Sequence, residues 1–150
     1  MDVTITRLGP MYYASAYGFG ESPELVAIEN LTAWAGPKGL LKPGEAEVYG
    51  FNNPFPTETR PRYGYELWLK VPPDTEPEGV IRIGEFFGGR YAVTRCEGAQ
   101  NIFPTWQQLA AWLETSDYEG TGLPGLEKHV SPFETPFEEY VFELYAPVRD

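Results

Sequence analysis

The stretch Tyr13–Gly20, YASAYGFG, decides the fold, because a counterpart lies 78 residues later in YAVTRCEG at Tyr91–Gly98. Three further pairs keep the same order at offsets of 78 or 77 residues: ENLTAWA from Glu29 with QQLAAWL from Gln107, Pro54-Phe55 with Pro132-Phe133, and ELW from Glu66 with ELY from Glu143. Blocks that recur in one order at a nearly constant spacing indicate an internal repeat.

Each copy of the repeat predicts a β-α-β-β unit. Residues 13–20 alternate bulky and small side chains, which is the two-residue period of a strand. A helix follows, with Ser22 at its N-cap and Pro23 in its first turn. A short and a longer strand complete each unit: Val48–Asn52 and Tyr63–Val71 in the first copy, Leu126–Val130 and Glu139–Pro147 in the second.

We therefore expect one α+β domain over residues 1–150, built as a tandem β-α-β-β pseudo-twofold repeat. The first repeat spans about 1–72, a Pro-rich linker about 73–79, and the second repeat about 80–150, with residues 80–87 leading into its first strand. Antiparallel sheets with one long helix per half leave their other faces for a ligand cleft between the halves.

The composition excludes several classes of protein. Eleven Lys and Arg against 22 Asp and Glu give a net charge of −11, and such a surface repels phosphate backbones, so direct nucleic-acid binding is not expected. The single cysteine, Cys96, cannot form an intramolecular disulfide, and neither a signal peptide nor a membrane-spanning apolar run is present, so we expect a cytoplasmic protein that has no membrane partner. No metal-ligand spacing and no nucleotide-binding loop occurs, and no metal or cofactor is expected.

Parity along the strands predicts which side chains face away from the helices. In Tyr63–Val71 the aliphatic set suits the helix side, and Glu66 and Trp68 point the other way, as Glu143 and Tyr145 do in the second copy. The 78-residue offset aligns Glu127 with Tyr49 and His129 with Phe51, which places all four on that same face. The candidate ligand-binding residues are Glu127, Glu66, Trp68, Tyr145, Tyr49, Phe51, His129, Glu143 and Tyr13.

Carboxylates among aromatic rings favour organic cations as ligands, because ring faces attract cations and restricted water strengthens the attraction to a carboxylate. The alternative is structural. On this reading the glutamates pair across strands with cations and only support the sheet register. The cations available for such pairs are Lys70, Arg62, Arg90 and Arg95.

The order of these motifs, including YGYELW, LEKHV and FELYAPV, resembles the GyrI-like family from Val3 to Val148. That family includes the effector-binding domains of AraC-type and MerR-type regulators such as Rob and BmrR. The resemblance implies two such units with a ligand cleft between them and, in multidrug-binding members, a buried glutamate that matches Glu127. Where many members have tyrosine two positions later, this chain has His129, and a histidine that titrates near pH 6.5 would make binding pH-dependent.

These observations lead to three hypotheses. The first is a standalone binding protein for cationic or aromatic drug-like compounds, a monomer or homodimer that acts in transcription only through a protein partner. The second is a hydrolase of strained electrophilic natural products, in which Glu66, Glu127 or Glu143 activates water and a tyrosine or His129 donates a proton. The third is an acidic inhibitor or interaction module that acts on a DNA-handling enzyme.

Overall fold

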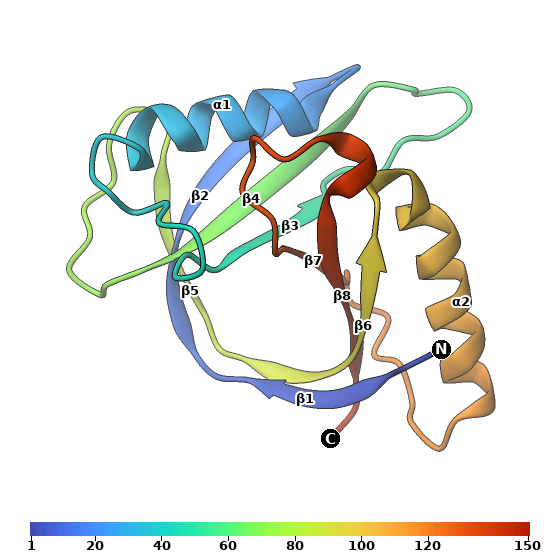
Figure 1. The fold of residues 1–150 in the computed structure, drawn as a ribbon. Coiled ribbons are helices and arrows are strands. Elements are labelled where there is room, and N and C mark those ends of the chain that lie inside the picture. Colours follow the sequence, from blue (N-terminus) through green and yellow to red (C-terminus); the bar gives the residue numbers. More distant parts are fainter. The chain divides into compact units, whose positions relative to one another are not determined.

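The computed structural model describes all 150 residues. The fold consists of two α-helices and antiparallel strands (Figure 1), which confirms the predicted α+β class. The residues divide into two compact units. The first unit is Met11–Phe86, and the second unit combines Met1–Pro10 with Phe87–Asp150.

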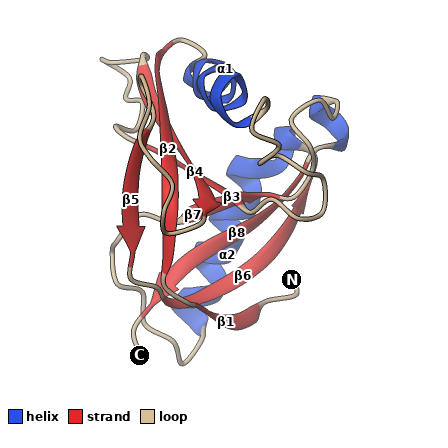
Figure 2. Ribbon diagram, turned by 90° about the vertical axis from the view of Figure 1, so that its left-hand side faces the viewer, coloured by secondary structure: helices blue, strands red, loops and turns tan.

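The first unit is a four-stranded antiparallel sheet in the order β3-β4-β2-β5. Helix α1 lies against β2 and β4, on one face of these strands (Figure 2). The elements are β2 (Met11–Gly20), α1 (Pro23–Ala35), β3 (Val48–Asn52), β4 (Tyr63–Val71) and β5 (Arg82–Phe86).

The second unit has the corresponding order, β1-β6-β8-β7, again antiparallel throughout. Short 3-10 turns precede its helix and its last strand. The elements are β1 (Thr4–Leu8), β6 (Gly89–Glu97), η1 (Ala99–Asn101), α2 (Ile102–Thr115), β7 (Leu126–His129), η2 (Phe137–Glu139) and β8 (Val141–Val148).

Two edge strands pair differently from the sequence-based expectation. Residues 80–87 are expected to lead into the second repeat, yet β5 pairs with β2 of the first unit, and β1, at the start of the chain, pairs with β6 of the second unit. Thr4–Leu8 and Arg82–Phe86 are 78 residues apart, the same spacing as the other repeated blocks. Each compact unit therefore takes its edge strand from the opposite half of the sequence.

Small residues on β2 allow α1 to approach the sheet closely. Ala14 and Ala16 are fully buried. A Cβ atom on Gly18 would lie 2.1 Å from the carbonyl oxygen of Pro23 and 2.7 Å from the backbone nitrogen of Ala27, both in α1. The alternation of small and bulky residues in YASAYGFG thus puts the helix on the small side and leaves the aromatic side for other contacts.

The core of the second unit forms between α2 and the sheet. Leu109 of α2 is fully buried and packs with Phe142 and Leu144 of β8 and with Cys96 of β6. The even-numbered residues of β8 therefore face the helix, as the parity of the sequence predicts. Neither α1 nor α2 is long and apolar enough to span a membrane.

The close approach at Gly18 leads to a stability prediction. Gly18→Ala should lower the free energy of unfolding by roughly 1–3 kcal/mol, because the added methyl must push α1 away from β2. Urea unfolding of the variant measures the change. Gly9→Ala is the matched control, since a Cβ at Gly9 meets nothing within 4 Å; equal stability of the two variants would show that the helix does not depend on this contact.

Candidate functional site

The face of the first unit opposite α1 carries the predicted carboxylate and aromatic residues of β4 and β3. In the β3–β4 register Phe51 lies directly across from Glu66, and Tyr49 directly across from Trp68. The intervening residues Tyr65 and Leu67 are buried on the helix side. Strand parity therefore brings Glu66, Trp68, Tyr49 and Phe51 together on one face.

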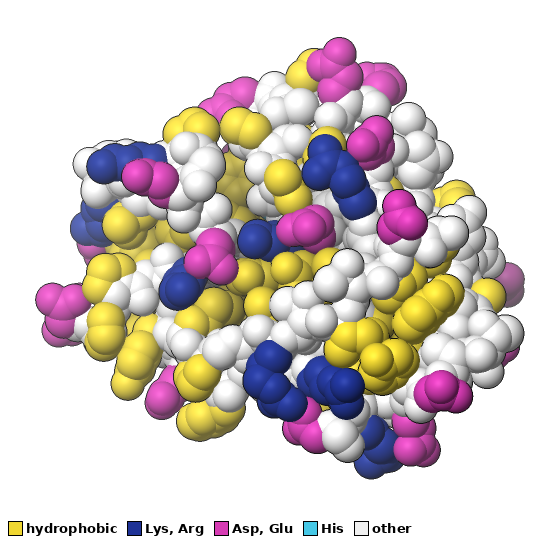
Figure 3. Space-filling model, turned by 60° about the horizontal axis from the view of Figure 1, so that its bottom comes forward, with side chains coloured by type: hydrophobic (Ala, Val, Ile, Leu, Met, Phe, Trp, Pro, Cys, Tyr) yellow, Lys and Arg dark blue, Asp and Glu magenta, His cyan; other side chains and the backbone are white.

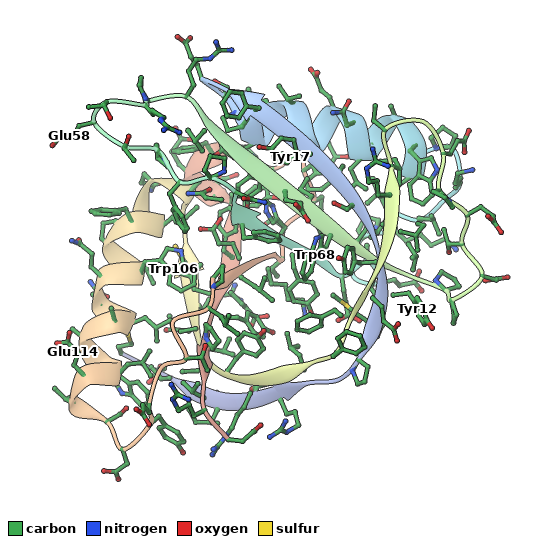
Figure 4. All side chains as sticks on the ribbon, turned by 180° about the vertical axis from the view of Figure 1, so that it is seen from behind. Tyr12, Tyr17, Glu58, Trp68, Trp106 and Glu114 are labelled. Atoms are coloured by element: carbon green, nitrogen blue, oxygen red, sulfur yellow. The ribbon has the colours of Figure 1, made fainter.

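Four rings on this face form a contiguous cluster around Trp68, which we call the aromatic wall. Tyr13 of β2 stacks on Trp68, with ring centroids 4.1 Å apart and planes 13° apart. Phe51 meets Trp68 edge-on at 5.0 Å and 79°, and Phe86 of β5 lies at 5.8 Å. Figure 4 labels Trp68 within the side chains of this unit. Phe86 is a member that the sequence reading misses, because it assigned residues 80–87 to the second repeat.

Glu66 is a carboxylate surrounded by aromatic groups. Its Oε2 atom accepts a hydrogen bond from the indole Nε1 of Trp68, and its cross-strand neighbours are Phe51 and Tyr17. Burial raises the pKa of Tyr13, and the nearby charge of Glu66 raises it further. The carboxylate therefore lies beside aromatic rings and accepts a hydrogen bond from an N–H donor.

The cations expected to neutralise Glu66 are engaged elsewhere. Lys70 forms an ion pair with Glu47 at 3.3 Å, and the guanidinium of Arg62 lies 5.7 Å from the ring centroid of Phe19. The purely structural reading of Glu66, as the partner of Lys70 or Arg62, is not what these contacts show.

A glycine makes room for the ring of Tyr13. Gly84 of β5 lies directly across from Tyr13, and a Cβ atom there would lie 2.4 Å from the Cζ and hydroxyl atoms of the Tyr13 ring. The absence of a side chain at Gly84 thus lets Tyr13 lie against β5 and reach Trp68.

The corresponding glutamate of the second unit has different surroundings. Glu143 lies across from Arg95 on one side and from Lys128 on the other, so two cations flank it. Tyr145 is buried and meets Tyr91 edge-on at 5.7 Å. Glu66 and Glu143 both lie on the strand face that points away from the helix, as predicted. Glu66, however, has aromatic residues across from it, whereas Glu143 has cations.

Glu127 and His129 do not lie on the predicted face. In the β7–β8 register Glu127 is opposite Leu144 and His129 is opposite Phe142, and both of these belong to the core under α2. The indole Nε1 of Trp106, in α2, donates a 2.9 Å hydrogen bond to Glu127, and Figure 4 shows Trp106 extending from the helix toward its strands.

The physical reason for this correction is a shift of one residue. The spacing between matching residues falls from 78 to 77 before β7, whereas the sequence-based alignment kept 78 through β7. Lys128, and not His129, is therefore the counterpart of Phe51: Lys128 lies opposite Glu143 as Phe51 lies opposite Glu66. A shift of one residue moves every side chain of a strand to the other face.

His129 is a buried core residue. It is 8% exposed, its Nδ1 lies 2.9 Å from the hydroxyl of Tyr140, and its ring contacts Phe133 and Phe142 edge-on. Burial lowers the pKa of His129 to about 3 and raises that of Tyr140. The imidazole is therefore neutral near pH 6.5, which corrects the expectation that it titrates there.

The lowered pKa of His129 predicts a pH dependence of stability. Between about pH 6.5 and about pH 3 the unfolded chain binds a proton at His129 that the folded chain excludes, so the free energy of unfolding falls as the pH is lowered, by up to about 1.4 kcal/mol per pH unit. Above about pH 6.5 this contribution is fully present. In His129→Phe this part of the slope should vanish.

Urea unfolding of both proteins across this pH range measures the difference. Tyr140→Phe is the control, because it removes the hydroxyl at 2.9 Å and keeps the imidazole. It should retain the slope. Identical slopes in the parent and His129→Phe would contradict the assignment.

Solved structures share this fold at low sequence identity. The EcmrR–DNA complex matches with a TM-score of 0.76 and 13% identity over 99% of this chain, which spans 57% of the EcmrR chain. The structure of SAV2435 bound to tetraphenylphosphonium matches with a TM-score of 0.61 and 13% identity, covering 99% of this chain and 94% of that one.

An integron cassette protein from the mobile metagenome of Vibrio cholerae matches with a TM-score of 0.59 and 13% identity, covering 98% of this chain and 95% of that one. No curated protein matches the chain in sequence. The Cass2 family of integron-associated effector-binding proteins matches residues 20–148. The chain belongs to this family of integron-associated effector-binding proteins.

Proposed function

We propose that the protein binds lipophilic organic cations at the aromatic wall, with Glu66 as the charged partner. The observation that carries the proposal is the placement of Glu66, which lies among Trp68, Phe51 and Tyr17 and has no cation opposite it. A cation over an aromatic face gains about 2 kcal/mol when desolvated, and a nearby carboxylate adds Coulomb attraction. An arrangement of this kind favours cations and disfavours anions.

Two findings outside the site support this proposal. The family is described as effector-binding, and a structural neighbour was solved with tetraphenylphosphonium, a cation that carries four phenyl rings. We propose for this chain the same chemical class, as a GyrI-like effector module related to the AraC-type and MerR-type domains. A link to transcription would then run through a protein partner, since the net charge of −11 does not favour DNA.

Within the first unit the ligand-contacting residues we propose are Glu66, Trp68, Tyr13 and Phe51. Tyr49 is 1% exposed and donates a 3.0 Å hydrogen bond to Glu47, so it supports the wall from β3.

The other four residues predicted from the sequence lie in the second unit. Glu127 stays a candidate carboxylate because an aromatic N–H donor already holds it. Tyr145 stays a candidate on the face of β8 that points away from α2. Glu143 shares that face but lies between Arg95 and Lys128, so we do not propose that it contacts the ligand. His129 is the weakest candidate, since it is neutral and packed under α2.

Strand faces also exclude one acid–base pair of the hydrolase hypothesis, the pair of Glu143 and His129. A proton donor must lie within hydrogen-bond reach of the group it serves. His129 lies opposite Phe142, on the face that packs against α2, whereas Glu143 is on the other face of β8. These two residues therefore cannot act together on one substrate.

The charge of Glu66 provides the main test. Glu66→Gln keeps an oxygen that can accept the Trp68 hydrogen bond and removes only the charge, so it should weaken tetraphenylphosphonium binding about tenfold, or about 1.4 kcal/mol. Calorimetric titration and thermal shift measure the loss.

The matched control is Glu143→Gln, which removes the same charge from the equivalent strand position between Arg95 and Lys128 and should bind as the parent does. Glu127→Gln tests the carboxylate that the family resemblance singles out. Loss of binding in Glu127→Gln alone would move the site away from the aromatic wall, and no binding by the parent would refute the proposal.

Gly84 provides a test that leaves every proposed contact residue in place. Gly84→Ala puts a methyl group where the Tyr13 ring lies, so Tyr13 must leave its stacked position on Trp68. We expect weaker cation binding, by roughly threefold to tenfold, from the loss of one ring of the wall. Fluorescence titration of the tryptophans reports the binding, and an affinity equal to that of the parent would show that Tyr13 is not part of the site.

A further inference from the structure

A concave site that differs in character from the aromatic wall lies within the second unit. It is a groove of about 440 Å³, a volume in the range of small-molecule pockets. It lies where β6 begins, where β8 ends and where the loop before β7 passes. Its lining residues include Gly88, Gly89, Arg90, Thr121, Arg149 and Asp150.

Two arginines, Arg90 and Arg149, line this groove and a third, Arg7, neighbours Arg90, although the chain has twice as many acidic as basic residues. Arg7 of β1 lies directly across from Arg90 of β6 in the strand register. The carbonyl of Arg149 accepts a 3.4 Å hydrogen bond from Nη1 of Arg90. Like charges directly opposite one another weaken a strand pair, and an anion bound beside them offsets such a repulsion.

Arg90 differs from the other two arginines in its partners. Arg7 pairs with the carboxylate of Asp150, and Arg149 pairs with Glu119 at 3.6 Å. Arg90 is half-buried as a residue, and its guanidinium has no carboxylate partner. It lies 5.1 Å from the ring centroid of Tyr118 and donates only to a backbone carbonyl. Stacking on Tyr118 leaves the edge of the planar fork for an oxyanion.

We propose that this groove binds a small organic anion through a carboxylate or phosphate group, with Arg90 as its anchor. The pairing of Arg7 with Asp150 shows that a carboxylate is already held at the rim. Thr121 adds a hydroxyl among the lining residues, and Gly88 and Gly89 leave the backbone accessible. Figure 3 shows the face on which β1 lies, where basic side chains sit beside one another and beside acidic ones.

Titration with citrate and with inorganic phosphate, at ionic strength held constant with chloride, tests the proposal. Binding should move the backbone amide resonances of Gly88, Gly89 and Thr121. Arg90→Gln should weaken it by roughly tenfold or more, because charge-assisted hydrogen bonds are lost. Arg90→Lys keeps the charge and loses the fork, so it should fall between the parent and Arg90→Gln.

Asp150→Asn releases Arg7 and should tighten binding by about twofold to fivefold, since an exposed ion pair is weak. Arg95→Gln is the matched control, because Arg95 is an exposed arginine of the same strand, paired with Glu97 at 3.0 Å, away from the groove. It should bind as the parent does, and so should Glu66→Gln, which separates this site from the aromatic wall.

Tighter binding of citrate would indicate a carboxylate ligand, and tighter binding of inorganic phosphate would indicate a phosphate ligand. Either result supports the site. Equal effects of Arg90→Gln and Arg95→Gln would reduce the effect to general charge screening and overturn the proposal. Amide shifts confined to residues outside the groove would overturn it as well.

Discussion

The two-residue period of antiparallel strands is the constraint on which the rest of this protein depends. Residues 13–20 put glycine and alanine toward α1 and aromatic rings toward the other face, so one strand serves both a helix contact and a ring cluster. β4 repeats the division, with Tyr65 and Leu67 buried and Glu66 and Trp68 opposite. A register shift of one residue in either strand would exchange the core for the ring cluster.

The same constraint explains how much the sequence could predict. Strand parity within Tyr63–Val71 is a local property, so the faces of Glu66 and Trp68 were predictable. The faces of Glu127 and His129 could not be predicted in this way. They depend on whether the spacing changes from 78 to 77 before or after β7, and the spacing of 77 at β8 is compatible with both. Only the pairing of β7 with β8 decides this.

Long-range pairing also sets the limit for the remaining site residues. Phe86 joins the aromatic wall because β5 pairs with β2, and Arg7 reaches Arg90 because β1 pairs with β6. Residues 7, 90 and 149 show no local motif, since their proximity arises from sheet register alone. The two units share a strand order yet differ in chemistry, with rings around Glu66 and cations across from Glu143.

The exchange of edge strands has a genetic consequence. The chain passes between the compact units at residues 10–11 and again at 86–87, so a cut at either place leaves them covalently joined through the other. One continuous segment, residues 11–86, specifies the first unit, whereas the second unit needs residues 1–10 as well as residues 87–150. A recombination break at residues 73–79, where the sequence pattern puts the linker, would therefore separate β5 from the rest of the first unit.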